Sequence, residues 1–179
     1  AVACDPAFNF VYEANIRYLH HLGEVTYFSP LADTSLPDAG FVYLPGGYPE
    51  LYLAALSANR QMLQSIRRYV ESGGKLLAEC GGMMYLCDEI RDKNGDVYPM
   101  AGVLHQSATM ENMKLRLGYR TLLCNETRLK GHEFHYSRLV EQQNPLPSCA
   151  VAYTAKGVET DTPLYHYKNV WAGYTHLYW

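Results

Sequence analysis

The chain has 179 residues, of which 48 % are hydrophobic, so it is long and apolar enough to fold as one domain around its own core. Its net charge of −3 argues against a function that depends on a basic surface, such as binding to nucleic acid or to a membrane. No apolar run is long enough to cross a bilayer and the first residues do not resemble a signal peptide, which predicts a soluble, cytoplasmic protein.

Strand and helix patterns alternate through the first half of the chain. Apolar residues recur at helical spacing from Phe8 to Leu22, where Gly23 ends the pattern, and a second amphipathic segment ends at Gly73. The expected elements are a strand at 1–4, a helix at 8–22, strands at 24–28 and 41–45, a helix at 59–71, a strand at 75–79 and a helix at 81–90. This alternation predicts an α/β fold with a mostly parallel sheet and helices on both faces.

The second half of the chain has a different pattern. A turn is expected at Asn94-Gly95, and short strands are expected at 119–124, 149–155 and 169–179, with loops between them. These strands predict that the second half of the chain adds antiparallel strands. Ligands of parallel sheets bind at the carboxyl ends of strands, so the functional site is expected there.

Cys80 has the sequence context of a catalytic nucleophile. It follows the strand at 75–79 and precedes two glycines and a helix, which predicts a sharp strand-to-helix turn that presents the thiol above the sheet. We expect the helix N-terminus to favour the thiolate, and the amide of Gly81 to point toward an oxyanion. The alternative is a buried core cysteine followed by a glycine turn. The chain's five cysteines include no CxxC pair, so neither disulfides nor a zinc site is predicted.

A catalytic thiol needs a base, and His176 is the histidine best placed to act as one. It lies near the end of the strand expected at 169–179, which can run beside the other strands to the same edge of the sheet. His132 and His135 alternate with apolar residues as on a strand, and no third ligand accompanies them, so no metal site is predicted. Solvated or structural roles are expected for His20, His21 and His166.

Six segments, in order, resemble the glutamine amidotransferase domain of cobyrinic acid a,c-diamide synthase, a class I amidotransferase. They are VACDPAFNFVYEANI, YFSPLADTSLPD, YLPGGYPELY, LAECGGMMYL, GHEFHYS and GYTHLYW. The resemblance implies a three-layer, flavodoxin-like fold for a single glutamine amidotransferase domain at residues 1–179. It also implies hydrolysis of L-glutamine, with the ammonia used to amidate side chains a and c of cobyrinic acid in cobalamin biosynthesis.

The resemblance assigns roles to particular residues. It implies Cys80 as nucleophile, His176 as base, Gly47 and Gly81 as the oxyanion hole, and Gly46, Tyr136 and Ser137 as glutamine-binding residues. From the residues alone, Gly46-Gly47 also fits an ordinary tight turn, and the segment at 131–137 also fits a plain strand.

The third member of the catalytic triad departs from the pattern of many class I enzymes. They carry a glutamate two positions after the histidine, where this chain has Tyr178. Glu79, next to Cys80, could substitute for it or act as a charged neighbour, or it could face the other side of the strand in a salt bridge. Glu50 is a further acid near the site, with a charge role at a helix N-terminus as the alternative.

The nucleotide-binding part of such a synthase is missing from the sequence, because there is no GxxxxGK[ST] loop. We therefore expect no cofactor in this chain, and ATP, Mg²⁺ and a corrinoid in a synthetase domain, either in a longer native chain or in a separate subunit. Two alternatives remain: another thiol amidase or hydrolase on the same fold, or a non-catalytic domain that docks to and regulates a synthetase.

Overall fold

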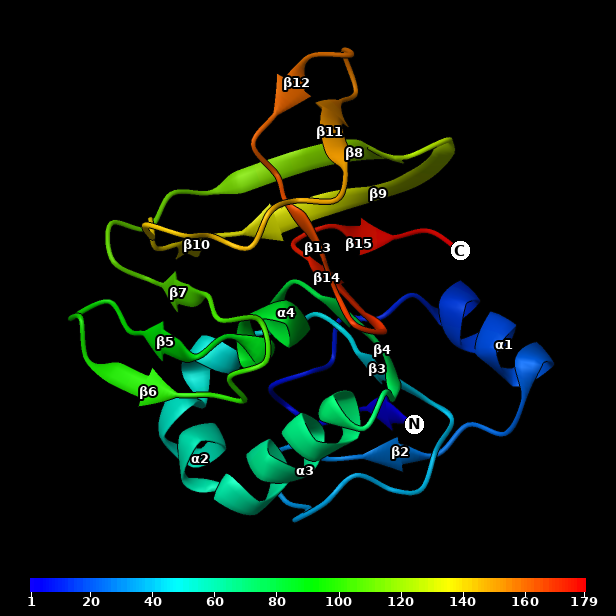
Figure 1. The fold of residues 1–179 in the computed structure, drawn as a ribbon, viewed down its shortest axis with the longest axis vertical. Helices are drawn as coiled ribbons and strands as arrows, with labels where there is room; N and C mark the ends of the chain where they lie inside the picture. The colour runs from blue at the N-terminus through cyan, green and yellow to red at the C-terminus, as the bar shows by residue number, and fades with distance from the viewer.

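The computed structural model describes residues 1–179 and is organised around a six-stranded sheet (Figure 1). The strands of this sheet are β1 (Val2–Ala3), β2 (Tyr27–Phe28), β3 (Phe41–Leu44), β4 (Lys75–Glu79), β13 (Leu164–Tyr167) and β14 (Val170–Gly173). Their order is β13-β14-β4-β3-β1-β2. Neighbouring strands are parallel except for the hairpin of β13 and β14, which confirms the mostly parallel sheet expected from the sequence.

Helices cover both faces of this sheet. They are α1 (Glu13–Leu22), the 3-10 helix η1 (Pro49–Leu51), α2 (Leu53–Ala58), α3 (Arg60–Glu71) and α4 (Gly81–Leu86). Leu76 and Ala78 of β4 belong to the main core with α2, α3 and α4, whereas Leu77 faces a cavity beside α1. Since adjacent residues of a strand point to opposite faces, α1 lies on the other side of the sheet from α3, as the three-layer fold requires.

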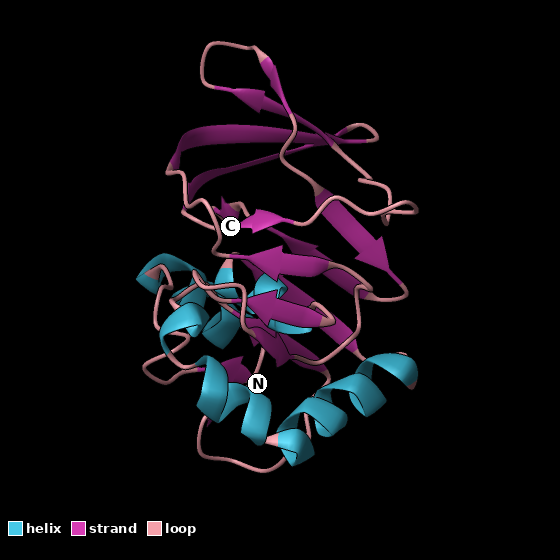
Figure 2. Cartoon of the chain, turned by 90° about the vertical axis from the view of Figure 1, so that its left-hand side faces the viewer, coloured by secondary structure: helices cyan, strands magenta, loops and turns pink.

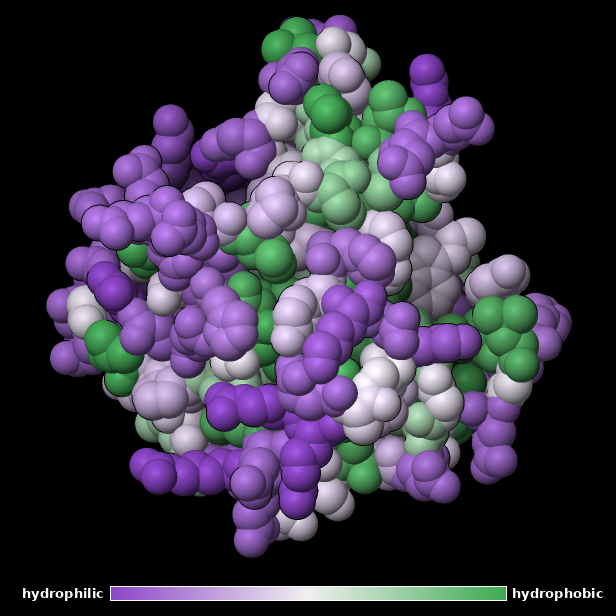
Figure 3. All heavy atoms as spheres, in the orientation of Figure 1, coloured by the Kyte–Doolittle hydropathy of each residue, from purple (hydrophilic) through white to green (hydrophobic).

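Two further sheets extend the fold. One contains β5 (Glu89–Arg91), β6 (Val97–Pro99), β7 (Ser107–Thr109) and β10 (Arg138–Leu139); the other contains β8 (Arg116–Cys124), β9 (Thr127–His135), β11 (Val151–Thr154), β12 (Glu159–Thr160) and β15 (His176–Leu177). Figure 2 shows helices beside the strands in the lower half of the molecule, and strands alone above them. Hydrophobic residues gather on the surface over β8 and β11 (Figure 3).

Three expected boundaries are wrong, because other hydrogen bonds hold the backbone at these places. The helix begins at Glu13 instead of Phe8, since Asp5 accepts hydrogen bonds from the amides of Ala7 (2.8 Å) and Phe8 (3.2 Å) and holds a turn there. The helix expected to reach 90 ends at Leu86, because the next residues pair as β5 with β6 around the Asn94-Gly95 turn. The strand expected at 169–179 divides, since β14 pairs with β4 and β15 with β9.

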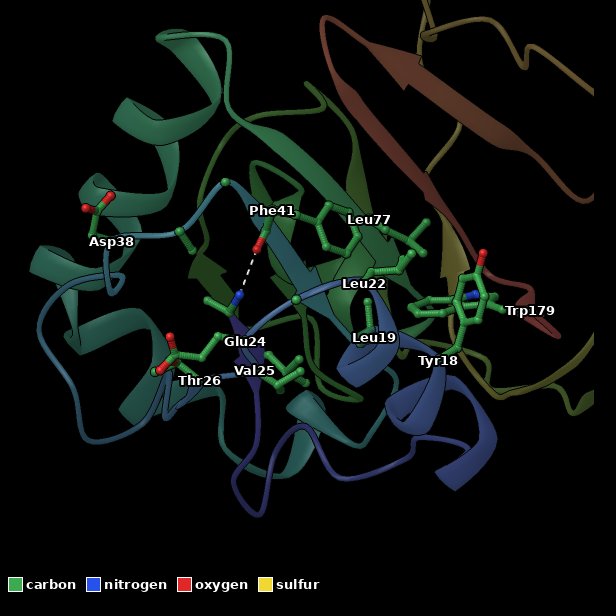
Figure 4. Close-up of a pocket in the computed structure, with 15 residues that line it drawn as sticks. Tyr18, Leu19, Leu22, Glu24, Val25, Thr26, Asp38, Phe41, Leu77 and Trp179 are labelled. Carbon is green, nitrogen blue, oxygen red and sulfur yellow. Dashed lines mark hydrogen bonds between the residues drawn. The ribbon is translucent and has the colours of Figure 1, made fainter.

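A large cavity lies between α1 and the amino-terminal part of the sheet. It has a volume of about 760 Å³, and Leu19, Leu22, Leu77 and Trp179 are among the residues that line it (Figure 4). The apolar face of α1 therefore lines an open cavity, and Leu22 is 68 % exposed. None of the predicted site residues lines this cavity. No helix of the fold is both long enough and apolar enough to span a membrane.

Candidate active site

Cys80 lies at the carboxyl end of β4, where the strand passes directly into α4. Its backbone has φ of 48° and ψ of −107°, a conformation that is strained for any residue with a side chain. Two backbone hydrogen bonds hold it: the amide of Cys80 donates to Gly173 O (2.8 Å), and the amide of Met84 donates to Cys80 O (3.0 Å). The strand-to-helix turn expected at this cysteine is therefore present.

The thiol of Cys80 is buried and is not ionised near neutral pH. Its sulfur lies 3.9 Å from Phe134 O, and only 4 % of the residue is exposed. Burial raises the pKa of the thiol to about 12, and the nearby charge of Glu50 adds to the rise. The backbone amide of Gly81, at the start of α4, favours the thiolate as expected, but the desolvation of the buried sulfur outweighs it and the net pKa is raised.

His176 lies on β15, directly opposite His132 of β9 in the antiparallel pair. Its ring is 3 % exposed and is held between aromatic neighbours, with the Phe10 ring edge-on at 4.5 Å and the His132 ring stacked at 5.1 Å. Its Nδ1 is buried without a hydrogen-bond partner. Burial, reinforced by the charges of His132 and His135, lowers the pKa of His176 to about 3. The imidazole is therefore neutral near pH 7 and able to accept a proton.

The loop at Gly46-Gly47, between β3 and η1, connects the two candidate catalytic residues. A Cβ on Gly46 would lie 2.2 Å from Cε1 of His176, and a Cβ on Gly81 would lie 3.2 Å from the amide nitrogen of Gly47. A Cβ on Gly47 itself would lie 2.1 Å from Ala7 O. The loop thus contacts the imidazole on one side and the turn after Cys80 on the other. A Cβ on Gly46 would disturb the first contact, and a Cβ on Gly81 would disturb the second.

Glu79 anchors the segment that carries His176. Its carboxylate accepts a hydrogen bond from the Tyr43 hydroxyl (2.7 Å) and another from the backbone amide of Leu177 (3.1 Å), the residue after His176. The side chain is therefore neither exposed nor in a salt bridge. Burial raises the pKa of Glu79 to about 7, although both hydrogen bonds oppose the rise. This geometry makes Glu79 a positioning residue for β15.

Replacing Glu79 with glutamine is expected to flatten the pH dependence of stability. In the wild-type chain the folded-state pKa of about 7 exceeds the ordinary value of 4.5, so the stability present below pH 4.5 is lost as the pH rises through 7. The difference corresponds to about 3 kcal/mol. Urea unfolding at pH 4.5 and pH 8 measures it. If the free energy of unfolding changes between the two pH values by the same amount in the wild type and in Glu79→Gln, Glu79 titrates normally in the folded chain.

Three further residues were named from the sequence. Glu50, in η1, is close enough for its charge to act on the thiol, and burial raises its own pKa. Ser137 is buried, with its hydroxyl 3.1 Å from the Tyr174 hydroxyl. Tyr136 is 41 % exposed. The glutamine-binding roles of Tyr136 and Ser137 stay predictions.

Some residues at the site were not singled out from the sequence. Phe10 contacts the ring of His176, and the Tyr12 hydroxyl lies 2.5 Å from Nδ1 of His132. Both lie in the first of the six resembling segments, which was the available signal. Glu133, one residue before the carbonyl that Cys80 contacts, is fully buried and was likewise missed. It lies in the fifth of the resembling segments, which was again the available signal.

The fold and the turn at Cys80 define the class of protein. The structure of PurLQS from Thermotoga maritima has a TM-score of 0.66 with this chain at 18 % sequence identity, covering 98 % of this chain and 85 % of that one. The fold is that of the class I glutamine amidotransferases.

The family follows from sequence comparison. A profile of the CobB/CobQ-like glutamine amidotransferase domain matches residues 1–179, and the chain belongs to this family. It is 40 % identical to hydrogenobyrinate a,c-diamide synthase of Pseudomonas aeruginosa and to cobyrinate a,c-diamide synthase of Fusobacterium nucleatum. These matches cover 99 % of this chain but only 40 % and 41 % of the two relatives, so the chain spans about two fifths of their length.

Proposed function

We propose that this domain hydrolyses L-glutamine to glutamate and ammonia through a thioester on Cys80. The proposal is carried by the strained turn at Cys80 and by the neutral, buried His176. The loop at Gly46-Gly47 contacts both the His176 ring and Gly81, the residue after Cys80. A thiol, a base and two backbone amides around one loop are the groups that acyl transfer requires.

In the first half of the reaction, the sulfur of Cys80 attacks the amide carbon of glutamine while the thiol proton passes to His176. Because His176 is neutral and the thiol is protonated, proton transfer and attack are coupled. The amides of Gly47 and Gly81 donate to the oxyanion that forms. Collapse of the intermediate breaks the carbon–nitrogen bond, and His176 returns the proton to the departing nitrogen, which leaves as ammonia.

In the second half, water attacks the thioester while His176 accepts its proton. The carbon–sulfur bond then breaks, glutamate leaves, and the thiol of Cys80 is restored. Glu79 holds the backbone of Leu177, so it fixes the position of His176 without touching the reacting atoms. This division of roles accounts for a site that lacks a glutamate two residues after the histidine.

The use of the ammonia is inferred from the relatives. Their names describe a,c-diamide synthases of cobyrinate and hydrogenobyrinate, so we assign the ammonia to amidation of the a and c side chains of a corrinoid in cobalamin synthesis. We assign ATP, Mg²⁺ and the corrinoid to the part of such synthases that this chain does not span. A docked synthetase part is then the principal partner.

Glutamate release from L-glutamine tests the proposal, measured for the chain alone and with the separately produced synthetase part of a relative. The proposal predicts release that the synthetase part increases. Binding of that part without any glutamate release would favour a regulatory domain. Comparable hydrolysis of unrelated amides would favour a general thiol amidase.

Replacing Gly46 with alanine is expected to lower turnover about 100-fold, because its Cβ would displace the ring of His176 and a misplaced catalytic group costs a factor of that order. Gly40→Ala is the matched control, since a Cβ there meets nothing within 4 Å. Steady-state assays at saturating L-glutamine compare the two. Full activity in Gly46→Ala would mean that turnover does not require His176 in its observed position.

A further inference from the structure

The cavity beside α1 leaves apolar side chains of a helix and of the main sheet only partly packed. α1 buries a single residue, Asn15, whereas Tyr18 and Leu22 of the same helix are 50 % and 68 % exposed. Leu77 lines the same cavity and belongs to β4, an interior strand of the sheet. Parallel sheets are normally covered on both faces, and an open apolar patch on a protein marks an interaction site. The cavity is therefore suited to an apolar partner.

Both ends of the chain line this cavity. The amino group of Ala1 donates a hydrogen bond to Phe41 O (2.7 Å), and Trp179, which is 37 % exposed, is also part of the wall (Figure 4). The match covers 40 % and 41 % of the two relatives, so about three fifths of each relative lies outside it. Whichever end of the matched region that remainder joins, it leaves the domain at this cavity. The connection holds the remainder at high local concentration beside an apolar surface.

The lining of the cavity also indicates the chemistry of the partner. Beside its apolar residues it contains the exposed acids Glu24 and Asp38, and it contains no lysine, arginine or histidine. Asp38 lies on the opposite side of the cavity from Leu22 and Trp179 (Figure 4). An apolar segment with a lysine or arginine at one end would complement this arrangement.

The wall of the cavity is hydrogen-bonded to the segment that carries His176. The side chain of Asn15, on α1, donates to Leu177 O (2.9 Å) and accepts from the amide of Trp179 (3.4 Å). Asn15 thus joins the helix beside the cavity to the two residues on either side of Tyr178, directly after His176. Hydrogen-bond networks of this kind couple one site to another. A partner seated against α1 is therefore connected to the proposed catalytic base.

We propose that this cavity is the docking site of the synthetase part, filled by an apolar segment of that part with a basic residue at one end. The proposal rests on the glutaminase function, because it places the contact through which the synthetase part increases glutamate release. The partner acts on His176 through α1 and residues 177–179, without contacting Cys80.

Binding of the separately produced synthetase part of the Pseudomonas aeruginosa relative tests the docking site. Calorimetric titration gives its Kd for the wild type and for Leu22→Asp. We expect Leu22→Asp to raise the Kd about 10- to 100-fold, because the docked segment would bury an unpaired carboxylate. The concentration of the synthetase part that gives half-maximal stimulation of glutamate release should rise by the same factor. An unchanged Kd would overturn the proposal.

Val158→Asp is the matched control. Val158 is 62 % exposed, precedes β12 and does not line the cavity, so this variant should bind with the wild-type Kd. Both variants alone should melt at the wild-type temperature, because both side chains are exposed. A wild-type dimer that Leu22→Asp makes monomeric, with an unchanged Kd for the synthetase part, would assign the cavity to a second copy and overturn the proposal. A raised Kd in Leu22→Asp, with no glutamate release by any of the proteins, would support the docking site and overturn the glutaminase function.

If the two parts do not associate when separate, they are produced as one chain in the order of the relative. Hydrogen exchange of the amides of residues 18–22 is then compared with that of the chain alone. Slower exchange in the joined chain, lost again in Leu22→Asp, would support the docking site, because a bound segment holds α1 in place. Equal exchange in the joined chain and in the chain alone would overturn it.

Discussion

Replacing Cys80 with alanine is expected to reduce glutamate release from L-glutamine by at least about 1000-fold, because no thioester can form without the sulfur. The substitution removes one heavy atom, the sulfur, from a residue that is 4 % exposed, so the fold should be retained. Steady-state glutamate release, together with a circular-dichroism melt of each protein, measures the effect. Cys80→Ser should be similarly inactive, since a hydroxyl is a far weaker nucleophile here.

Cys4→Ala is the matched control for Cys80→Ala. Cys4 is an exposed free cysteine, so its loss should leave turnover at the wild-type level. Residual activity of Cys80→Ala above a few per cent of wild type would mean that hydrolysis proceeds without a thioester at this position.

Replacing His176 with asparagine is expected to lower turnover about 100- to 10,000-fold, the usual contribution of a general acid–base residue. Asparagine keeps a polar side chain of smaller size among Phe10 and His132, so the pocket should persist. His166→Asn is the control, because that ring stacks on Trp171 on β14 and is placed outside the site. Turnover by His176→Asn at the control rate would contradict the mechanism.

The same variant has a second readout in its acid stability. Burial lowers the folded-state pKa of His176 from 6.5 to about 3, so stability present above pH 6.5 is lost as the pH falls toward 3. His176→Asn lacks this loss. Its free energy of unfolding, relative to that of the wild type, should therefore rise as the pH is lowered from 6.5 to 4. A constant difference across this range would mean that the imidazole is solvated in the folded chain.

Much of the fold was predictable because local signals and tertiary structure agree. The strand at 75–79, the helix before it and the turn at Asn94-Gly95 all follow from periodicity and glycine positions, whereas the strands on either side of that turn were not predicted. The division of 169–179 was not predictable, since both halves have strand character. What separates them is the choice of partner: β14 pairs with β4 and β15 with β9. The local sequence pattern does not indicate which distant strand will be the partner.

The site was predictable to a similar extent. The strand-to-helix turn at Cys80 follows from its sequence context, whereas the position of His176 depends on the division of the last strand. The raised pKa of the thiol could not be predicted, because it arises from burial beneath other segments and from the charge of Glu50. The buried ion pair between Glu133 and Arg120 was also hidden, because β8 and β9 bring the two residues together only in the folded hairpin.

The central claim is that Cys80 is the nucleophile that attacks glutamine, and covalent labelling tests it most directly. The wild-type chain, with the synthetase part present, is incubated with a diazoketone analogue of L-glutamine, and the labelled peptide is identified by mass spectrometry. We predict one label per chain, on Cys80, at a rate that L-glutamine slows. Labelling of the more accessible Cys4 or Cys149, unaffected by L-glutamine, would contradict the account.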